Sequence, residues 1–357
     1  MNKITFSTLL LATIILFSCE TKVDINADYK DITVVHAAID PNDTEHYVKI
    51  NHAFLEDGVS ATNLAANSDN FNYPKDELSV IVDELRGDNG NFVAAFPLTR
   101  TINEKPKNPG IFANDSNVLF KFTATINRNN LYKLKIINNK LNKLITSQTL
   151  IVGTNTVTVP TLNQKMAFWN GDVVSGDYLS RSISFTTGKN IGRVEARLVF
   201  NYTNFFIDSS FQTERIVMPL GEKKTINSST GNEVLEWTME GATFFSNVIA
   251  NTPTTLPFLS HREVGNVSME FIVTGTELNI FMEVNEPSNN VNQEKPAYTN
   301  INNGLGVFSS RETYNWVSTV DPQTGNINLT APTILKLKSL GLSYCFGNSA
   351  SSGHQCP

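Results

Sequence analysis

The side chains that most often do chemistry are few in this chain, and they are scattered along it. The spacings HExxH, CxxC and GxSxG and the phosphate-binding glycine loops are absent, so no metal site, nucleophile or nucleotide loop can be recognised. Asp83 and Glu84 are adjacent in a strand-like segment and should point to opposite faces. His46 and His52 would share one face of a strand at a separation of about 20 Å, too far for one metal ion. We therefore expect no metal, no cofactor and no enzymatic activity, although a carboxylate pair assembled by the fold stays possible.

One cysteine stands in a context that does predict chemistry. Lys3 gives the N-terminus a positive charge, residues 4–17 are mainly apolar, and the segment ends in Leu16-Phe17-Ser18-Cys19. A bilayer-spanning helix needs about 20 apolar residues, so the shorter run is typical of a signal peptide. The last four residues resemble the lipobox of bacterial lipoproteins, in which diacylglycerol alkylates the cysteine thiol before cleavage. We expect residues 1–18 to be a lipoprotein signal peptide and Cys19 to carry lipid; a plain secretory signal or an uncleaved anchor is the alternative.

The segment after this cysteine has the composition of a tether. Residues 20–29 read ETKVDINADY and are mostly polar; ten extended residues reach at most about 35 Å. Acidic residues just behind the cysteine resemble a surface-export signal of Bacteroidota lipoproteins. We therefore expect residues 19–30 to form a lipidated tether, which makes the membrane a partner through the lipid. The same residues predict an outer-membrane lipoprotein that faces outward at the cell surface.

The other two cysteines form an even pair once Cys19 is lipidated. Cys345 and Cys356 enclose ten residues, FGNSASSGHQ, which are flexible enough to close a loop. In an oxidising compartment such a pair predicts a disulfide. The alternative is two free thiols. Residues 347–357 are expected to form a flexible tail.

Aromatic residues offer a second kind of site. Trp169 lies in AFWNGD and Trp316 in TYNWV, and both could stack on a sugar if they were exposed. Core packing is the competing interpretation, because large aromatic side chains are mostly buried.

Short strands must position these residues in the first part of the chain. Residues 31–160 contain seven or eight β-branched or alternating segments separated by turns rich in Asn and Gly. Spacings of this kind predict an immunoglobulin-like β-sandwich. The polar insertion at residues 56–75 should hold a short helix or a loop over one end of it.

The second part, residues 161–346, is also expected to be β-rich, with one or two packed helices. Apolar residues recur every three or four positions over residues 232–251, which predicts an amphipathic helix on a sheet. Residues 266–284 are expected to form a strand hairpin around Gly275, and ILKLKSLGL a short last helix.

Charge excludes one class of partner. The chain has 28 basic and 34 acidic residues. Removing the signal peptide takes away Lys3, which leaves 27 − 34 = −7. A negative, Asn-rich surface has no electrostatic footprint for nucleic acid.

A stretch near the C-terminus carries a family resemblance. Residues 299–308 read TNINNGLGVF, in which Asn302-Asn303-Gly304 is a turn and Gly306 permits close backbone approach. The stretch resembles the C-terminal signature of a family of uncharacterised Bacteroidota surface lipoproteins, which the lipobox and the strands ITVVHAAI and HYVKINHAF also resemble. The resemblance implies an accessory surface protein that serves a TonB-dependent outer-membrane receptor or envelope complex. It supplies no catalytic residues, and a glycan- or ligand-binding lipoprotein is the alternative function.

Overall fold

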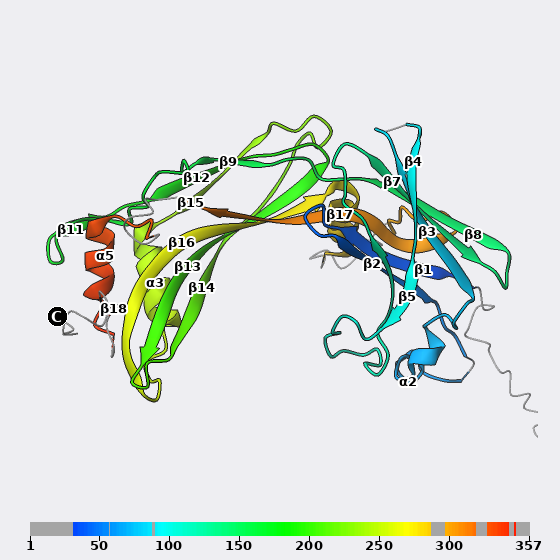
Figure 1. The fold of residues 1–357 in the computed structure, drawn as a ribbon, viewed down its shortest axis with the longest axis horizontal. Helices are drawn as coiled ribbons and strands as arrows, with labels where there is room; N and C mark the ends of the chain where they lie inside the picture. Colours follow the sequence, from blue (N-terminus) through cyan, green and yellow to red (C-terminus); the bar gives the residue numbers. More distant parts are fainter. Residues whose placement is uncertain are drawn as a thin grey trace, which may run out of the picture.

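The computed structural model describes residues 31–56, 58–87, 90–286, 297–318, 327–342 and 346–347. It confirms a mainly β protein in which a β-sandwich is followed by a second β-rich part with packed helices. Two lobes form an arch, and the long strands of the second lobe curve along its inner side (Figure 1). No helix among these residues is long and apolar enough to span a bilayer.

The first lobe contains two facing sheets. One has the order β17-β1-β2-β6-β5 and the other the order β4-β3-β7-β8. Apolar side chains alternate along these strands, as Val48 and Ile50 do in β2, and they meet in one core that also contains Ile301 and Phe308. The strands are β1 (Thr33–Ile39), β2 (Glu45–His52), β3 (Leu78–Leu85), β4 (Phe92–Pro97), β5 (Thr99–Ile102), β6 (Val118–Thr123), β7 (Leu131–Asn138) and β8 (Lys143–Leu150).

The insertion at residues 56–75 folds as a short helix and a turn. Helix α2 (Ala61–Ala65) begins at Ser60, whose hydroxyl accepts a hydrogen bond from the backbone N–H of Asn63. The 3₁₀ turn η1 (Ser68–Asn70) follows. Both lie at the lower end of the first lobe, as Figure 1 shows for α2.

The second lobe is built on long antiparallel strands. Strands β13, β14, β16 and β17 make a curved sheet, and β9, β12 and β15 cover its convex side (Figure 1). Phe185, Phe200, Phe244 and Phe271 are fully buried in the core of this lobe. The elements are β9 (Thr156–Val159), β10 (Trp169–Gly171), β11 (Gly176–Tyr178), β12 (Arg181–Thr186), β13 (Ile191–Phe206), β14 (Phe211–Lys224), β15 (Val234–Met239), α3 (Gly241–Asn251), β16 (Leu259–Gly275), α4 (Thr276–Asn285), β17 (Gly304–Val317), α5 (Ala331–Lys338) and β18 (Phe346–Gly347).

Strand β17 belongs to both lobes. Its first half, Gly304–Ser310, pairs in parallel with β1, and its second half, Arg311–Val317, pairs antiparallel with β16. Gly306 makes the first pairing possible: its φ is +108°, and a Cβ atom there would lie 2.0 Å from the carbonyl oxygen of Val35. No L-residue with a side chain fits this position without displacing β1.

The lobes do not follow the expected division at residue 160. Strand β9, at the end of the expected first part, pairs with β12 of the second lobe. Residues 301–308, far beyond that division, pack into the first core. Contacts between segments far apart in the sequence place β9 in the second lobe and residues 301–308 in the first. A local sequence pattern does not contain that information.

Two segments differ from their predicted secondary structure. The helix expected over residues 232–251 is helical only from Gly241, because β15 buries the alternate residues Leu235, Trp237 and Met239 against the core. The hairpin expected around Gly275 is wrong, since β16 ends there and α4 begins. Gly192 lets this helix pack tightly, because a Cβ atom there would lie 2.5 Å from Cβ of Asn279. The short last helix is confirmed as α5.

Candidate binding site at the crown of the arch

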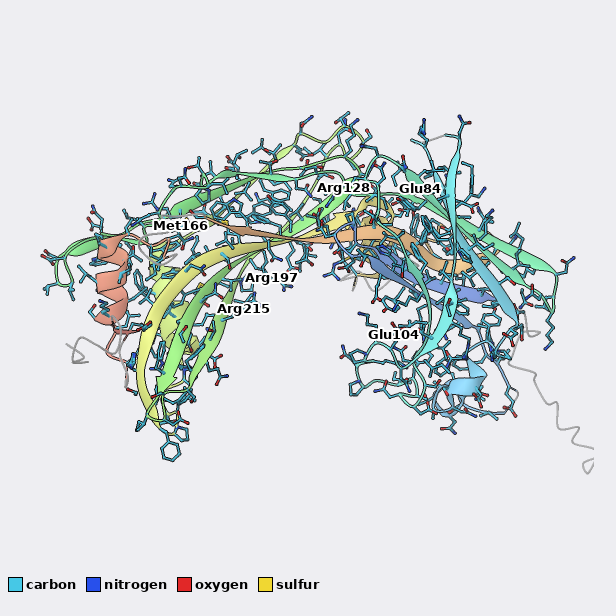
Figure 2. The ribbon with its side chains drawn as sticks, viewed as in Figure 1. Glu84, Glu104, Arg128, Met166, Arg197 and Arg215 are labelled. Carbon is cyan, nitrogen blue, oxygen red and sulfur yellow. The ribbon has the colours of Figure 1, made fainter. Side chains whose placement is uncertain are left out.

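A pocket of about 1040 Å³ lies where the two lobes meet; we call it the crown pocket. It is formed by connections between strands, together with Leu150 at the end of β8. Its lining comes from Gly87, residues 125–129, Leu150, Gly153, Thr154, residues 187–190 and residues 229–232. Figure 2 shows Arg128, one of these residues, beside the junction of the lobes.

Three glycines bring the backbones of three loops into contact at this pocket. A Cβ atom on Gly188 would lie 2.4 Å from the carbonyl carbon of Gly153, and one on Gly231 would lie 2.6 Å from the carbonyl carbon of Gly188. Gly231 also has a φ of +67°. Because no side chain fits between these loops, peptide groups form this part of the pocket wall.

Arg128 fixes this wall through hydrogen bonds to Glu312 and to two backbone carbonyl groups. Its guanidinium donates to both carboxylate oxygens of Glu312, at 3.0 and 2.8 Å, and to the carbonyl oxygens of Val152 and Gly153. Glu312 is in β17 and is 3% exposed. Such a bidentate pair is geometrically specific, so Arg128 ties the loop before β7 to the strand shared by the lobes.

The amides of Asn42 and Asn155 complete this cluster. Asn42 Nδ2 donates to Glu312 Oε1 at 2.9 Å, and its Oδ1 accepts from Arg128. Asn155 Nδ2 donates to Glu312 Oε2 at 3.0 Å, and its Oδ1 accepts from the backbone N–H of Gly188. The buried Glu312 carboxylate is therefore paired with the Arg128 cation and hydrogen-bonded by two amides, and the pocket wall is fixed from both lobes.

The remaining lining offers hydrogen bonds to a polar ligand. Thr154, Asn129 and Thr230 supply hydroxyl and amide groups, and Lys189 supplies an exposed ammonium. Hydroxyl, amide and backbone groups recognise a neutral polar molecule by direction and spacing rather than by charge. This arrangement suits a sugar or an extended peptide.

The prediction that Trp169 and Trp316 are stacking platforms is wrong, because both side chains are buried. Trp169 is 5% and Trp316 is 4% exposed, and both belong to the core of the second lobe. Trp169 also donates from Nε1 to the carbonyl oxygen of Asp172, and the Lys336 ammonium lies 4.2 Å from its ring centroid. Core packing, the competing interpretation, applies to both.

His46 and His52 have different neighbours, and so do the carboxylates of Asp83 and Glu84. His46 contacts the carbonyl oxygen of Ala124 and His52 packs against Tyr73. Asp83 pairs with Lys135, whereas Glu84 accepts from Asn130 and Tyr132. Figure 2 shows Glu84 in the first lobe. Within the described part of the chain, no group of three or more acidic, His or Cys side chains is arranged to hold a metal ion.

The cysteine predictions fall outside the described residues. These are the lipid on Cys19, the signal peptide and tether at residues 1–30, and the disulfide between Cys345 and Cys356. The expected tail at residues 347–357 is described only at Gly347.

The signature TNINNGLGVF acts as a clamp between the two sheets of the first lobe. Asn302 exchanges backbone hydrogen bonds with Thr146 of β8, at 2.8 and 3.3 Å. Asn300 bonds both the N–H and the carbonyl oxygen of Phe308 through its side-chain amide. Asn303 donates from its amide to the carbonyl oxygen of Leu144. The motif therefore fixes the start of β17 against the opposite sheet.

A smaller pocket of about 460 Å³ lies beside this clamp. It is lined by Lys133, residues 146–148, Glu277, Tyr298, Asn300 and Asn302. Burial raises the pKa of the Glu277 carboxyl, which is reached only weakly by the hydroxyls of Thr149 and Ser309, both at 3.4 Å. Burial raises the pKa of Tyr298, and the Glu277 charge adds to this shift. A negative charge in this pocket is therefore costly.

Sequence reasoning did not identify the crown pocket. The loops that form it are rich in Asn, Gly, Ser and Thr, as in residues 127–130 and 229–232, but that composition is typical of any turn. Arg128 and Glu312 are 184 residues apart, and nothing local marks them as partners. Only the pairing of β17 with β1 and β16 brings them together.

Comparisons with known proteins give no family. No protein-family model and no curated protein matches this sequence. Among solved structures, the C-terminal globular domain of an oligosaccharyltransferase from Pyrococcus abyssi is similar at a TM-score of 0.27 and 10% identity. The match covers 70% of this chain and spans half the length of that structure. A similarity this low carries no argument about function.

We expect Arg128→Met to lower the free energy of unfolding by about 3 kcal/mol, because it leaves the buried Glu312 carboxylate without its cation. Arg197→Met is the matched control: Arg197 pairs with Glu195 in β13, and both side chains are about one third exposed. Exposed pairs contribute about 1 kcal/mol or less. Urea unfolding of both variants measures the difference, and equal small losses would show that the Arg128 cluster does not hold the lobes.

We expect Glu277→Gln to raise the free energy of unfolding at neutral pH by about 1 kcal/mol, because it removes a poorly solvated charge. In the folded protein the pKa of Glu277 lies above its ordinary value, so on raising the pH the carboxyl loses its proton in the unfolded chain before it does so in the folded one. The free energy of unfolding of the wild type therefore falls as the pH rises from the ordinary pKa to the folded pKa. The gain should therefore vanish near pH 4, below the ordinary pKa of Glu.

Glu283→Gln, on the same helix, is the control for this pH dependence. Its hydrogen bond from Lys224 holds the pKa of the Glu283 carboxyl below the ordinary value. Neutralising it should bring no gain at neutral pH. Thermal unfolding across the pH range compares the two variants; a loss of stability for Glu277→Gln at pH 7 would contradict the assignment.

Proposed function

We propose that this chain is an outer-membrane lipoprotein, exposed at the cell surface, whose body is a non-catalytic interaction module. The segment Leu16-Phe17-Ser18-Cys19 supports the anchor, and the acidic tether supports the outward orientation. The partner is an outer-membrane receptor of the TonB-dependent class or an associated envelope complex. This partner follows from the family resemblance of residues 299–308.

The observation that carries the interaction role is the use of buried charge within the arch. Glu312 is bound by Arg128, and the buried Arg193 guanidinium is bound by Glu222 and Glu286, at 3.0 and 2.8 Å. These charges fix the arrangement of strands and loops. The crown loops then present amide and hydroxyl groups from a rigid base, which is suited to recognition.

A tagged chain expressed in its native host tests the anchor and the partner together. Wild-type protein should fractionate with the outer membrane and co-purify with a receptor after mild solubilisation, whereas Cys19→Ala should leave the membrane fraction and lose that partner. Globomycin, which blocks the lipoprotein signal peptidase, should cause the precursor to accumulate. Unchanged processing and membrane association in Cys19→Ala would refute the anchor, and repeated recovery of the lipidated protein alone would refute the partner.

A glycan- or ligand-binding role is the second candidate, and the crown pocket favours it. Its volume of about 1040 Å³ is at the upper end of the range for small-molecule sites. Its hydroxyl, amide and peptide groups suit a neutral oligosaccharide. The buried tryptophans take no part in this version of the proposal.

A glycan array probed with the wild-type protein and three variants tests this candidate. Lys189→Ala should weaken binding about tenfold, the effect of about 1.4 kcal/mol from one charged hydrogen bond. Asn129→Trp should block the pocket by volume. Lys75→Ala removes an exposed lysine that is not among the lining residues, so it should bind as the wild type does. No binding by the wild type would end this candidate.

A further inference from the structure

The free end of the second lobe carries large exposed apolar side chains. Ile207, Phe211 and Phe258 are 73%, 69% and 76% exposed. They lie at the turn between β13 and β14 and just before β16, and we call this group the apolar tip. Figure 1 shows that these strand ends form the lower end of the lobe. Apolar groups gathered on one exposed tip usually mark a contact with a protein or a membrane.

The apolar tip is a built structure rather than a loose loop. The backbone N–H of Ile207 donates to the carbonyl oxygen of Phe258 at 2.9 Å, which joins the two turns. The Asp208 carboxylate accepts from the backbone N–H and the hydroxyl of Ser210, at 3.0 and 2.6 Å. A pocket of about 340 Å³ lies between the turns. The tip therefore presents its side chains in a fixed arrangement.

The backbone at Phe258 is strained in a way that keeps its ring exposed. Its φ is +62°, a conformation that bulky residues rarely adopt. Strain of this kind persists only where the surrounding structure imposes it, and it is concentrated at functional positions. Here the strained residue is an aromatic with 76% of its surface in water, so the fold maintains an exposed ring at a cost.

The first lobe has a second apolar group on the same side of the arch. Ile111 and Phe112 are 71% and 48% exposed. The next residue, Ala113, donates its backbone N–H to the carbonyl oxygen of Ala65 in α2. Figure 1 shows α2 at the lower end of the first lobe, level with the lower end of the second lobe. Both ends of the arch therefore carry exposed apolar residues.

We propose that the two ends of the arch rest on a lipid bilayer, with Ile207, Phe211 and Phe258 of one lobe and Ile111 and Phe112 of the other inserted into its interface. A planar apolar surface can receive two separate tips at once. The inference depends on the lipid anchor proposed above, because a tether of about 35 Å at full extension keeps the body close to the membrane. Apolar insertion also agrees with the net charge of the mature chain, 27 − 34 = −7, which offers no general attraction to anionic headgroups.

Fluorescence quenching by brominated lipid tests the contact. The full mature lipidated chain is reconstituted in phosphatidylcholine vesicles with or without bromine on the acyl chains, and Phe258→Trp and Phe112→Trp each supply a reporter. The three native tryptophans, Trp169, Trp237 and Trp316, are all buried in the core, so they contribute little to the change. Each reporter should lose emission in brominated vesicles relative to unbrominated ones, because bromine on the acyl chains quenches an indole that lies at the acyl boundary.

Ile226→Trp is the matched control. Ile226 is 96% exposed and lies in the connection from β14 to β15 that also lines the crown pocket, so its reporter should not be quenched. Quenching of Phe258→Trp no greater than that of Ile226→Trp, in protein that floats with the vesicles, would overturn the inference. So would a photo-crosslinker at position 258 that captures a protein while lipid quenching is absent.

Flotation separates this inference from the anchor. If the purified mature chain carries no lipid, mass spectrometry of its N-terminus shows that the anchor proposal has failed. If the lipid is present and the chain floats but the reporters are not quenched, only the contact of the arch ends has failed. In lipidated protein, Ile207→Ser with Phe258→Ser should leave flotation unchanged and weaken the quenching of Phe112→Trp without abolishing it, because a single inserted end holds the arch on the bilayer less firmly.

Discussion

The arch depends on one strand, β17, whose two halves are paired with different lobes. Gly304–Ser310 pairs in parallel with β1 and Arg311–Val317 antiparallel with β16. Parallel pairing at this point requires a close backbone approach, which only Gly306 permits. Glu312 lies just after the change of partner, and its bidentate bond to Arg128 fixes the crown loops against the same strand. The register of β1, the junction of the two lobes and the position of the crown pocket wall therefore all depend on how β17 is paired.

The sequence predicted the elements well where apolar periodicity is strong and local. Strand β13 shows such a pattern, with Val194, Ala196 and Leu198 alternating, and α5 agrees with the short last helix expected at ILKLKSLGL. The pattern failed at residues 234–239, because Leu235, Trp237 and Met239 alternate as in a strand and the helical spacing applies only from Gly241. It failed at α4 because tertiary packing on Gly192 and β17 selects a helix there.

The site was much less accessible to prediction. A binding role was predicted for Trp169 and Trp316 because of their residue type. Whether these side chains are buried depends on the layers that cover them, and both are buried. The crown pocket uses turn residues that have no distinctive composition, together with an ion pair between residues 184 positions apart. The signature at residues 299–308 was visible in the sequence. Its function in the fold, a set of Asn side chains that join β8 to β17, required the pairing to be known.

The parallel pairing of β1 with β17 also determines when the first lobe can finish folding. Thr33 is opposite Gly304, so the sandwich at the start of the chain has an open edge until residues near the other end have been made and delivered. Pairing over such sequence distances is slow, because the closure entropy is lost before the contacts form. A chain that crosses a membrane from its N-terminus would therefore emerge with β1 unpaired on that side for most of its passage. The first lobe can complete this sheet only after residues 304–310 have arrived, so in a chain that crosses a membrane in this direction folding would follow export as a consequence of topology.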